Sequence, residues 1–178
     1  MRHAAKRIFS AAVLAACLMA CSGGTTVNFP GTKDGARALL GEFMKPGADN
    51  KKLTMELRPT KDDYRAVFKE SQTADRSEVF NDKLWSSGNA VVAPKEGQTE
   101  LILASATTED FRNYAGEYSA FPVTMISLAD NHLKDGVTFY AFKFVKPGET
   151  SGMAFEGLTH INGKWRLFPK PWRFLEEK

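Results

Sequence analysis

Tyr140 and His160 are side chains of the C-terminal third whose types and spacing suit a binding or catalytic site. Strand alternation aligns Tyr140 with Phe142 and Phe144, and His160 with Leu158. Pointing inward from adjacent strands, the two are polar points in an apolar wall, the usual composition of a small-molecule site. There the imidazole could act as a general base or anchor a ligand. The alternative is a collapsed core in which hydroxyl and imidazole hydrogen-bond to each other or to the backbone.

The position of His160 follows from a predicted β-hairpin. Asn162-Gly163 supplies both residues of a tight two-residue turn, which needs positive φ twice. The predicted cross-strand pairs are Ile161 with Lys164, His160 with Trp165, Thr159 with Arg166, and Leu158 with Leu167. Trp165 is therefore expected on the inward face beside His160, and Arg166 on a solvated face.

The last twenty residues, "THINGKWRLFPKPWRFLEEK", interleave cations with aromatic side chains. This pattern could form a surface for an anionic polymer or a membrane, or it could be the closing strand of a small sheet. We favour the strand, because alternation explains the cations around Trp165 and because Pro169 and Pro171 end the pattern. Trp172 and Phe174 are expected to cover an open end of the core.

Helical spacing dominates the first half of the chain. Residues 32–45 predict an amphipathic helix that ends at a proline-glycine pair. Thr60 can cap a second helix, and Asp62-Asp63 suit its first turn, where Asp63 can reach back to the cap. Residues 76–85 continue or follow this helix, with the apolar positions Val79, Phe80 and Leu84.

The period of the pattern changes after residue 88. Residues 89–94 and 99–105 predict a short hairpin. A brief helix is expected to begin around residues 108–110. Residues 121–136 are ambiguous, and we favour a helix there over a strand. Residues 136–146 are aromatic and β-branched on both faces, which predicts a central strand.

The N-terminus has the layout of a secretory signal peptide, residues 1–20. A basic start precedes an apolar run from Ile8 to Met19 that is too short to span a bilayer. The sequence "LMAC", which ends at Cys21, resembles a bacterial lipobox. That resemblance implies cleavage after residue 20 and lipid attachment to the Cys21 thiol. Ser22 implies, by similarity to enterobacterial lipoproteins, sorting to the outer membrane, facing the periplasm.

The expected processing also changes the charge and the thiol content. Removal of residues 1–20 takes away three of the 24 Lys and Arg residues, which leaves 21 cations against 21 Asp and Glu. A near-neutral chain has no general basic field, so nucleic acid is not an expected partner. With Cys17 removed and Cys21 lipidated, no thiol remains. His132 is expected at a solvated helix end, and with His160 as the other remaining histidine we predict no metal site and no cofactor.

Helices followed by a C-terminal meander predict an α+β fold, with N-terminal helices packed on one face of a curved antiparallel β-sheet. The order of elements and the segment "FKFVKPGETSGMAFEGLTHINGKWRLFPKPWR" resemble the NTF2-like (cystatin-like, SnoaL-type) cone folds. The resemblance implies a pocket that different members use for catalysis, binding or dimerisation through the sheet. By analogy with ketosteroid isomerase-like members, it nominates Tyr140 and Glu156.

The expectation for function is a lipid-anchored envelope protein. Residues 21–31 are expected to be a flexible tether and residues 32–178 a single domain. The domain is expected to bind a small apolar ligand or a protein partner without catalysis, with Tyr140, Glu156, His160 and Trp165 as the candidate ligand contacts. The alternative is a hydrolase or isomerase that uses the same pocket. In either case, the protein is expected to contact the membrane through the lipid on Cys21.

Overall fold

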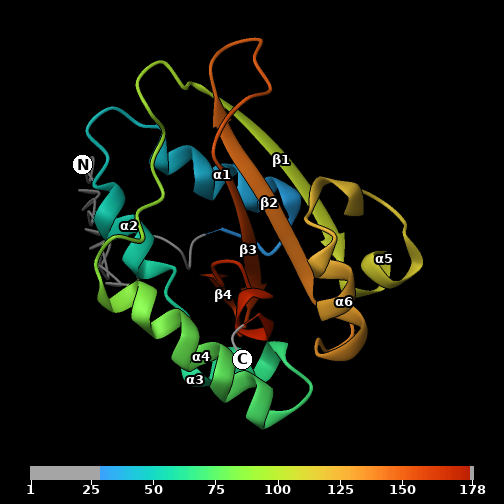
Figure 1. The fold of residues 1–178 in the computed structure, drawn as a ribbon. Helices are drawn as coiled ribbons and strands as arrows, with labels where there is room; N and C mark the ends of the chain where they lie inside the picture. The colour runs from blue at the N-terminus through green and yellow to red at the C-terminus, as the bar shows by residue number, and fades with distance from the viewer. Residues whose placement is uncertain (1–28, 177–178) are drawn as a thin grey trace, which may run out of the picture.

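The computed structural model describes residues 29–176, which form a four-stranded antiparallel sheet and six α-helices (Figure 1). The helices are α1 (Lys33–Phe43), α2 (Asn50–Glu56), α3 (Lys61–Val67), α4 (Ser71–Ser86), α5 (Thr108–Asn113) and α6 (Thr124–Asn131), with short 3₁₀ turns η2 (Tyr118–Ala120) and η3 (Arg173–Leu175). The strands are β1 (Glu100–Thr107), β2 (Thr138–Val145), β3 (Ala154–Ile161) and β4 (Lys164–Leu167). The predicted α+β class is confirmed. The signal segment and Cys21 lie outside the described residues.

The helix α3 begins with the predicted capping box. The Thr60 backbone N–H donates to Asp63 Oδ2 at 2.8 Å, and the Asp63 backbone N–H donates to Thr60 Oγ1 at 3.4 Å. The same reciprocal arrangement opens α5, where the cap is Thr107 and the returning carboxylate is Asp110. These helix starts follow from local sequence, because each box needs only two residues three positions apart.

The sheet order is β1-β2-β3-β4, so β2 is central as predicted. All four predicted pairs of the β3–β4 hairpin are present, including His160 opposite Trp165. Asn162 and Gly163 have φ values of 52° and 72°, as the two-residue turn requires.

One strand was predicted wrongly, and one ambiguous segment is resolved. Residues 89–94 form no strand. The backbone N–H of Val92 donates instead to Thr54 Oγ1 of α2 at 2.9 Å, and the Val92 side chain is buried there. This segment therefore packs along α2 rather than pairing with β1. Residues 124–131 form the helix α6, in agreement with the favoured alternative for this region.

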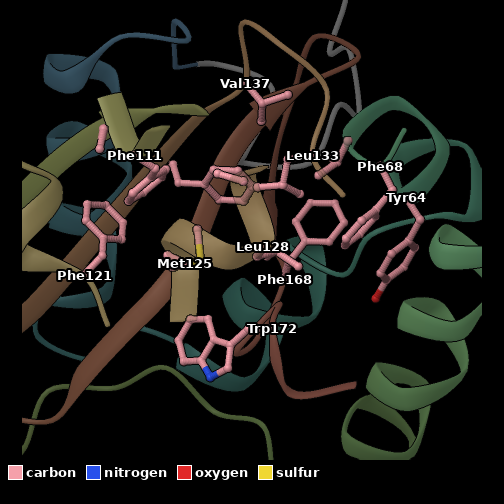
Figure 2. Packing of buried hydrophobic residues seen from close by; sticks show 14 of the residues in the cluster. Tyr64, Phe68, Phe111, Phe121, Met125, Leu128, Leu133, Val137, Phe168 and Trp172 are labelled. Atoms are coloured by element: carbon pink, nitrogen blue, oxygen red, sulfur yellow. The ribbon is translucent and has the colours of Figure 1, made fainter. Parts of the chain in front are cut away.

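Helices cover both faces of the sheet, whereas the sequence predicted them on one. Phe139 and Ala141 of β2 belong to a cluster with α3, α5, α6 and the C-terminal segment (Figure 2). Tyr140, Phe142 and Phe144 point to the other face and pack with α1. A central strand that is aromatic on both faces needs apolar cover on each side.

Candidate functional site

Tyr140, His160 and Trp165 do lie together, as a closed aromatic cluster. The Trp165 ring centroid lies 5.2 Å from those of both Tyr140 and His160, edge-on in each case. The indole N–H donates to the Phe29 carbonyl at 3.0 Å. A Cβ placed on Gly31 would lie 2.4 Å from His160 Nδ1, so the chain entering α1 covers the imidazole.

Both rings pack on Trp165, and no hydrogen bond of the Tyr140 hydroxyl or the His160 imidazole is seen within residues 29–176. Burial raises the pKa of the Tyr140 hydroxyl and lowers the pKa of the His160 imidazole, which disfavours the charged form of both groups. None of the pockets described below is lined by Tyr140, His160 or Trp165.

Glu156 lies on the opposite face of the sheet, because a β-bulge interrupts the alternation of β3. The register with β2 shifts between the pair Tyr140–Leu158 and the pair Phe142–Phe155. Gly157, at the shift, has a φ of 87°, and a Cβ there would lie 2.0 Å from the Phe168 carbonyl oxygen. Only glycine tolerates both conditions. The structure therefore does not bring Glu156 and His160 together.

The C-terminal segment that follows β4 lines several surface pockets. Phe168, Trp172 and Phe174 point into the core cluster of Figure 2, as the sequence predicted for the last two. Lys170 stands between two prolines with a φ of 46°, a left-handed conformation that is rare for a side-chain-bearing residue. Strained backbone of this kind is found preferentially at binding and catalytic sites.

Two pockets meet at Lys170. The first, here called the α4 groove, has a volume of about 430 Å³ and lies between α4 and the C-terminal segment. The groove is lined by residues that include Phe80, Lys83, Leu84, Pro169, Lys170 and Arg173. The second, here called the Glu156 pocket, has a volume of about 420 Å³. This pocket is lined by residues that include Pro122, Glu156, Lys170, Trp172, Arg173 and Glu176.

The helix α4 buries both apolar and polar side chains, and its buried Ala74 and Trp85 belong to the two core clusters. Ser77 and Asn81 are buried, whereas Val79 is 62% exposed and Leu84 is 39% exposed. The sequence had indicated Val79, Phe80 and Leu84 as apolar positions of a helical stretch, and in an ordinary amphipathic helix the apolar face meets the core. Phe80 and Leu84 line the groove, and Phe80 also packs against the core cluster that contains Phe68 and Phe174.

The two pockets differ in charge. The α4 groove is lined by three cations, and no carboxylate of the described residues lines it. Lys83 and Lys170 form no ion pair within residues 29–176, and Arg173 Nε lies 3.9 Å from Glu176 Oε2, a weak contact. The other pocket contains Glu156, where burial raises the pKa of the carboxyl and the positive charge of Lys170 only partly offsets it.

Arg166 is buried in an ion pair, which corrects its predicted position on a solvated face. Its side chain is 10% exposed, and Nε donates to Asp63 Oδ2 at 2.7 Å while Nη1 donates to the Glu56 carbonyl at 3.0 Å. Asn162 Nδ2 donates to the other oxygen of Asp63 at 2.9 Å. Because partners occupy both carboxylate oxygens, this pair joins α3 to the β3–β4 hairpin and is not a candidate for catalysis.

Comparison of the chain with protein-family models, with curated proteins and with solved structures gave no match. Among the described residues, no helix is long and apolar enough to cross a membrane. In the same part of the chain, no group of three or more His, Cys, Asp or Glu side chains is placed to hold a metal ion.

Proposed function

We propose that the chain is a lipid-anchored envelope protein whose domain binds a small apolar ligand and catalyses no reaction. The α4 groove is the observation that carries this proposal. Its volume of about 430 Å³ falls in the range of small-molecule sites, and such sites combine an apolar lining with a few polar groups. Phe80, Leu84 and Pro169 supply the apolar lining. The order of helices followed by a C-terminal meander is what supports an NTF2-like assignment.

The anchor rests on the lipobox-like sequence that ends at Cys21. We expect mass spectrometry of the mature protein to find its N-terminus at Cys21 with added acyl chains. Cys21→Ser should abolish that modification and release the protein from the membrane fraction. An unmodified Cys21, or cleavage at another position, would contradict the anchor and the envelope location together.

The groove makes a binding prediction that needs no knowledge of the natural ligand. In the full chain carrying Cys21→Ser, which lacks the lipidation thiol, the neutral apolar dye Nile red should bind with enhanced fluorescence. Leu84→Asp should weaken this binding about tenfold or more, because the carboxylate must be desolvated when the dye binds. Fluorescence titration measures the affinity.

A matched control comes from β1. Ile102 is 38% exposed against 39% for Leu84, but Ile102 lies outside the groove. Ile102→Asp should leave the affinity for Nile red unchanged. Equal losses in both variants would mean that the dye reads general surface apolarity, and the groove would not be the binding site.

An enzyme is the second candidate, favoured by one observation. Burial raises the pKa of Glu156, and this carboxyl borders a pocket of about 420 Å³. A raised pKa suits a general acid or base, as a hydrolase or isomerase would need. Turnover of a generic ester or ketone substrate that Glu156→Gln abolishes, with Nile red binding intact, would favour this candidate over a pure binding domain.

A further inference from the structure

We propose that the ligand of the α4 groove is an amphiphilic anion, a molecule with one apolar chain or ring system and one acidic group. This inference rests on the proposed binding function and specifies its ligand. The apolar body would contact Phe80, Leu84 and Pro169, and the acidic group would lie among Lys83, Lys170 and Arg173.

The charges of the groove are the first argument. The three cations come from two segments, α4 and the C-terminal segment, and they line the same groove as its apolar side chains. Lys83 and Lys170 make neither an ion pair nor a side-chain hydrogen bond to any residue between 29 and 176. A neutral ligand would partly desolvate these ammonium groups without compensation. An anionic group would instead form charge-assisted hydrogen bonds with them.

The neighbouring pocket fixes the orientation of the acidic group. Glu156 and Glu176 line the far side of Lys170, in the Glu156 pocket. An acidic group placed there would meet these two carboxylates beside Lys170 and Arg173, whereas in the α4 groove it would meet three cations and no lining carboxylate. The acidic group of the ligand therefore belongs on the α4 side of Lys170.

The backbone at Lys170 is the second argument. Pro169 and Pro171 each have φ restricted by the ring, and the residue before a proline is further confined. Lys170 nevertheless has a φ of 46°. Its side chain lines the α4 groove, the Glu156 pocket and a smaller cavity of about 80 Å³. A strained residue at the junction of three cavities is the arrangement expected of a ligand contact.

Calorimetric titration with dodecanoate and with dodecanol tests the inference, in the full chain carrying Cys21→Ser. The two probes share the same chain and differ in charge. Because a carboxylate forms charge-assisted hydrogen bonds with the ammonium groups and a hydroxyl does not, dodecanoate should bind about tenfold or more tightly than dodecanol. Lys170→Gln and Lys83→Gln should each weaken dodecanoate binding by about tenfold and leave dodecanol within about twofold.

The control variant is Lys51→Gln, which changes an exposed lysine of α2 outside the groove. It should leave the affinity for both probes unchanged, and circular dichroism should confirm that each variant is folded. Equal affinities for dodecanoate and dodecanol, or a Lys170→Gln variant that behaves like Lys51→Gln, would overturn the anionic ligand while leaving apolar binding intact. If the parent protein with Cys21→Ser bound neither dodecanol nor Nile red, the proposed function itself would be contradicted.

A third arm separates a free amphiphile from a membrane surface. Vesicles of phosphatidylglycerol and vesicles of phosphatidylcholine present anionic and zwitterionic headgroups at a surface rather than a single detached chain. We expect neither to bind with a dependence on Lys170. Binding to the anionic vesicles that Lys170→Gln weakens, together with no binding of dodecanoate, would overturn the inference in favour of a membrane contact.

Discussion

Arg166→Ala should lower the free energy of unfolding by about 3–5 kcal/mol, the usual cost of removing one partner from a buried ion pair. The Asp63 carboxylate would stay buried without its cation, and the Glu56 carbonyl would lose a donor. Urea melts at neutral pH measure the change. Arg65→Ala is the matched control, because Arg65 is exposed and its ion pair is weak, with Nη2 3.8 Å from Asp75 Oδ1. We expect that variant to stay within about 0.5 kcal/mol of wild type.

The pH dependence of this effect follows from Asp63. Burial alone would raise the pKa of its carboxyl, but hydrogen bonds from Thr60 and Asn162 and the charge of Arg166 outweigh burial and hold the pKa below its usual value. A lowered pKa means that the stabilisation is complete above the unfolded value of about 3.9 and is lost as pH falls through the folded value. The difference between wild type and Arg166→Ala should therefore shrink in acid. A constant difference down to the acid transition would contradict the role assigned to Asp63.

Trp165→Ala should destabilise the domain by about 3–5 kcal/mol, as expected for deletion of a large buried aromatic side chain. The Trp165 side chain is fully buried and contacts the rings of Tyr140 and His160 edge-on. Its loss would leave a cavity between α1 and the sheet and would free the Phe29 carbonyl. Thermal or urea unfolding measures the effect.

Two comparisons sharpen this expectation. Trp165→Phe keeps an aromatic ring but removes the indole donor to the Phe29 carbonyl, which should cost about 1 kcal/mol for the hydrogen bond in addition to a smaller packing loss. Tyr114→Ala removes an aromatic ring that is 63% exposed and should change stability by about 0.5 kcal/mol or less. If Trp165→Ala and Tyr114→Ala melted at the same denaturant concentration, Trp165 would not be a core residue.

Local chemistry explains which elements could be predicted from sequence. The Asn162-Gly163 turn determines the register of its hairpin, because two positive φ angles permit only a few turn geometries. The capping box of α3 needs only Thr60 and Asp63. In both cases the signal lies within a few residues, so the correct prediction required no knowledge of the tertiary structure.

The remaining errors concern contacts between distant segments. Alternation correctly places Arg166 and Trp165 on opposite faces of β4, but it cannot show that α3 covers the face of Arg166. The partner Asp63 lies 103 residues away. The bulge at Gly157 reverses the alternation within β3, and there the Phe168 carbonyl, 11 positions further along the chain, lies against the glycine. The groove on α4 was missed for a similar reason, because helical spacing identifies an apolar face without showing whether the core or solvent meets it.

The hydrogen bond between Trp165 and the Phe29 carbonyl has a consequence for how far the domain can travel. It joins the chain to the sheet at Phe29, and the segment through Gly31 packs over His160. Eight residues lead from Cys21 to Phe29, and at about 3.4 Å per residue they reach at most about 27 Å. If Cys21 carries lipid, the domain is held within roughly its own diameter of the bilayer. The domain can then occupy only a thin layer next to the membrane, and it can bind a ligand only within that layer.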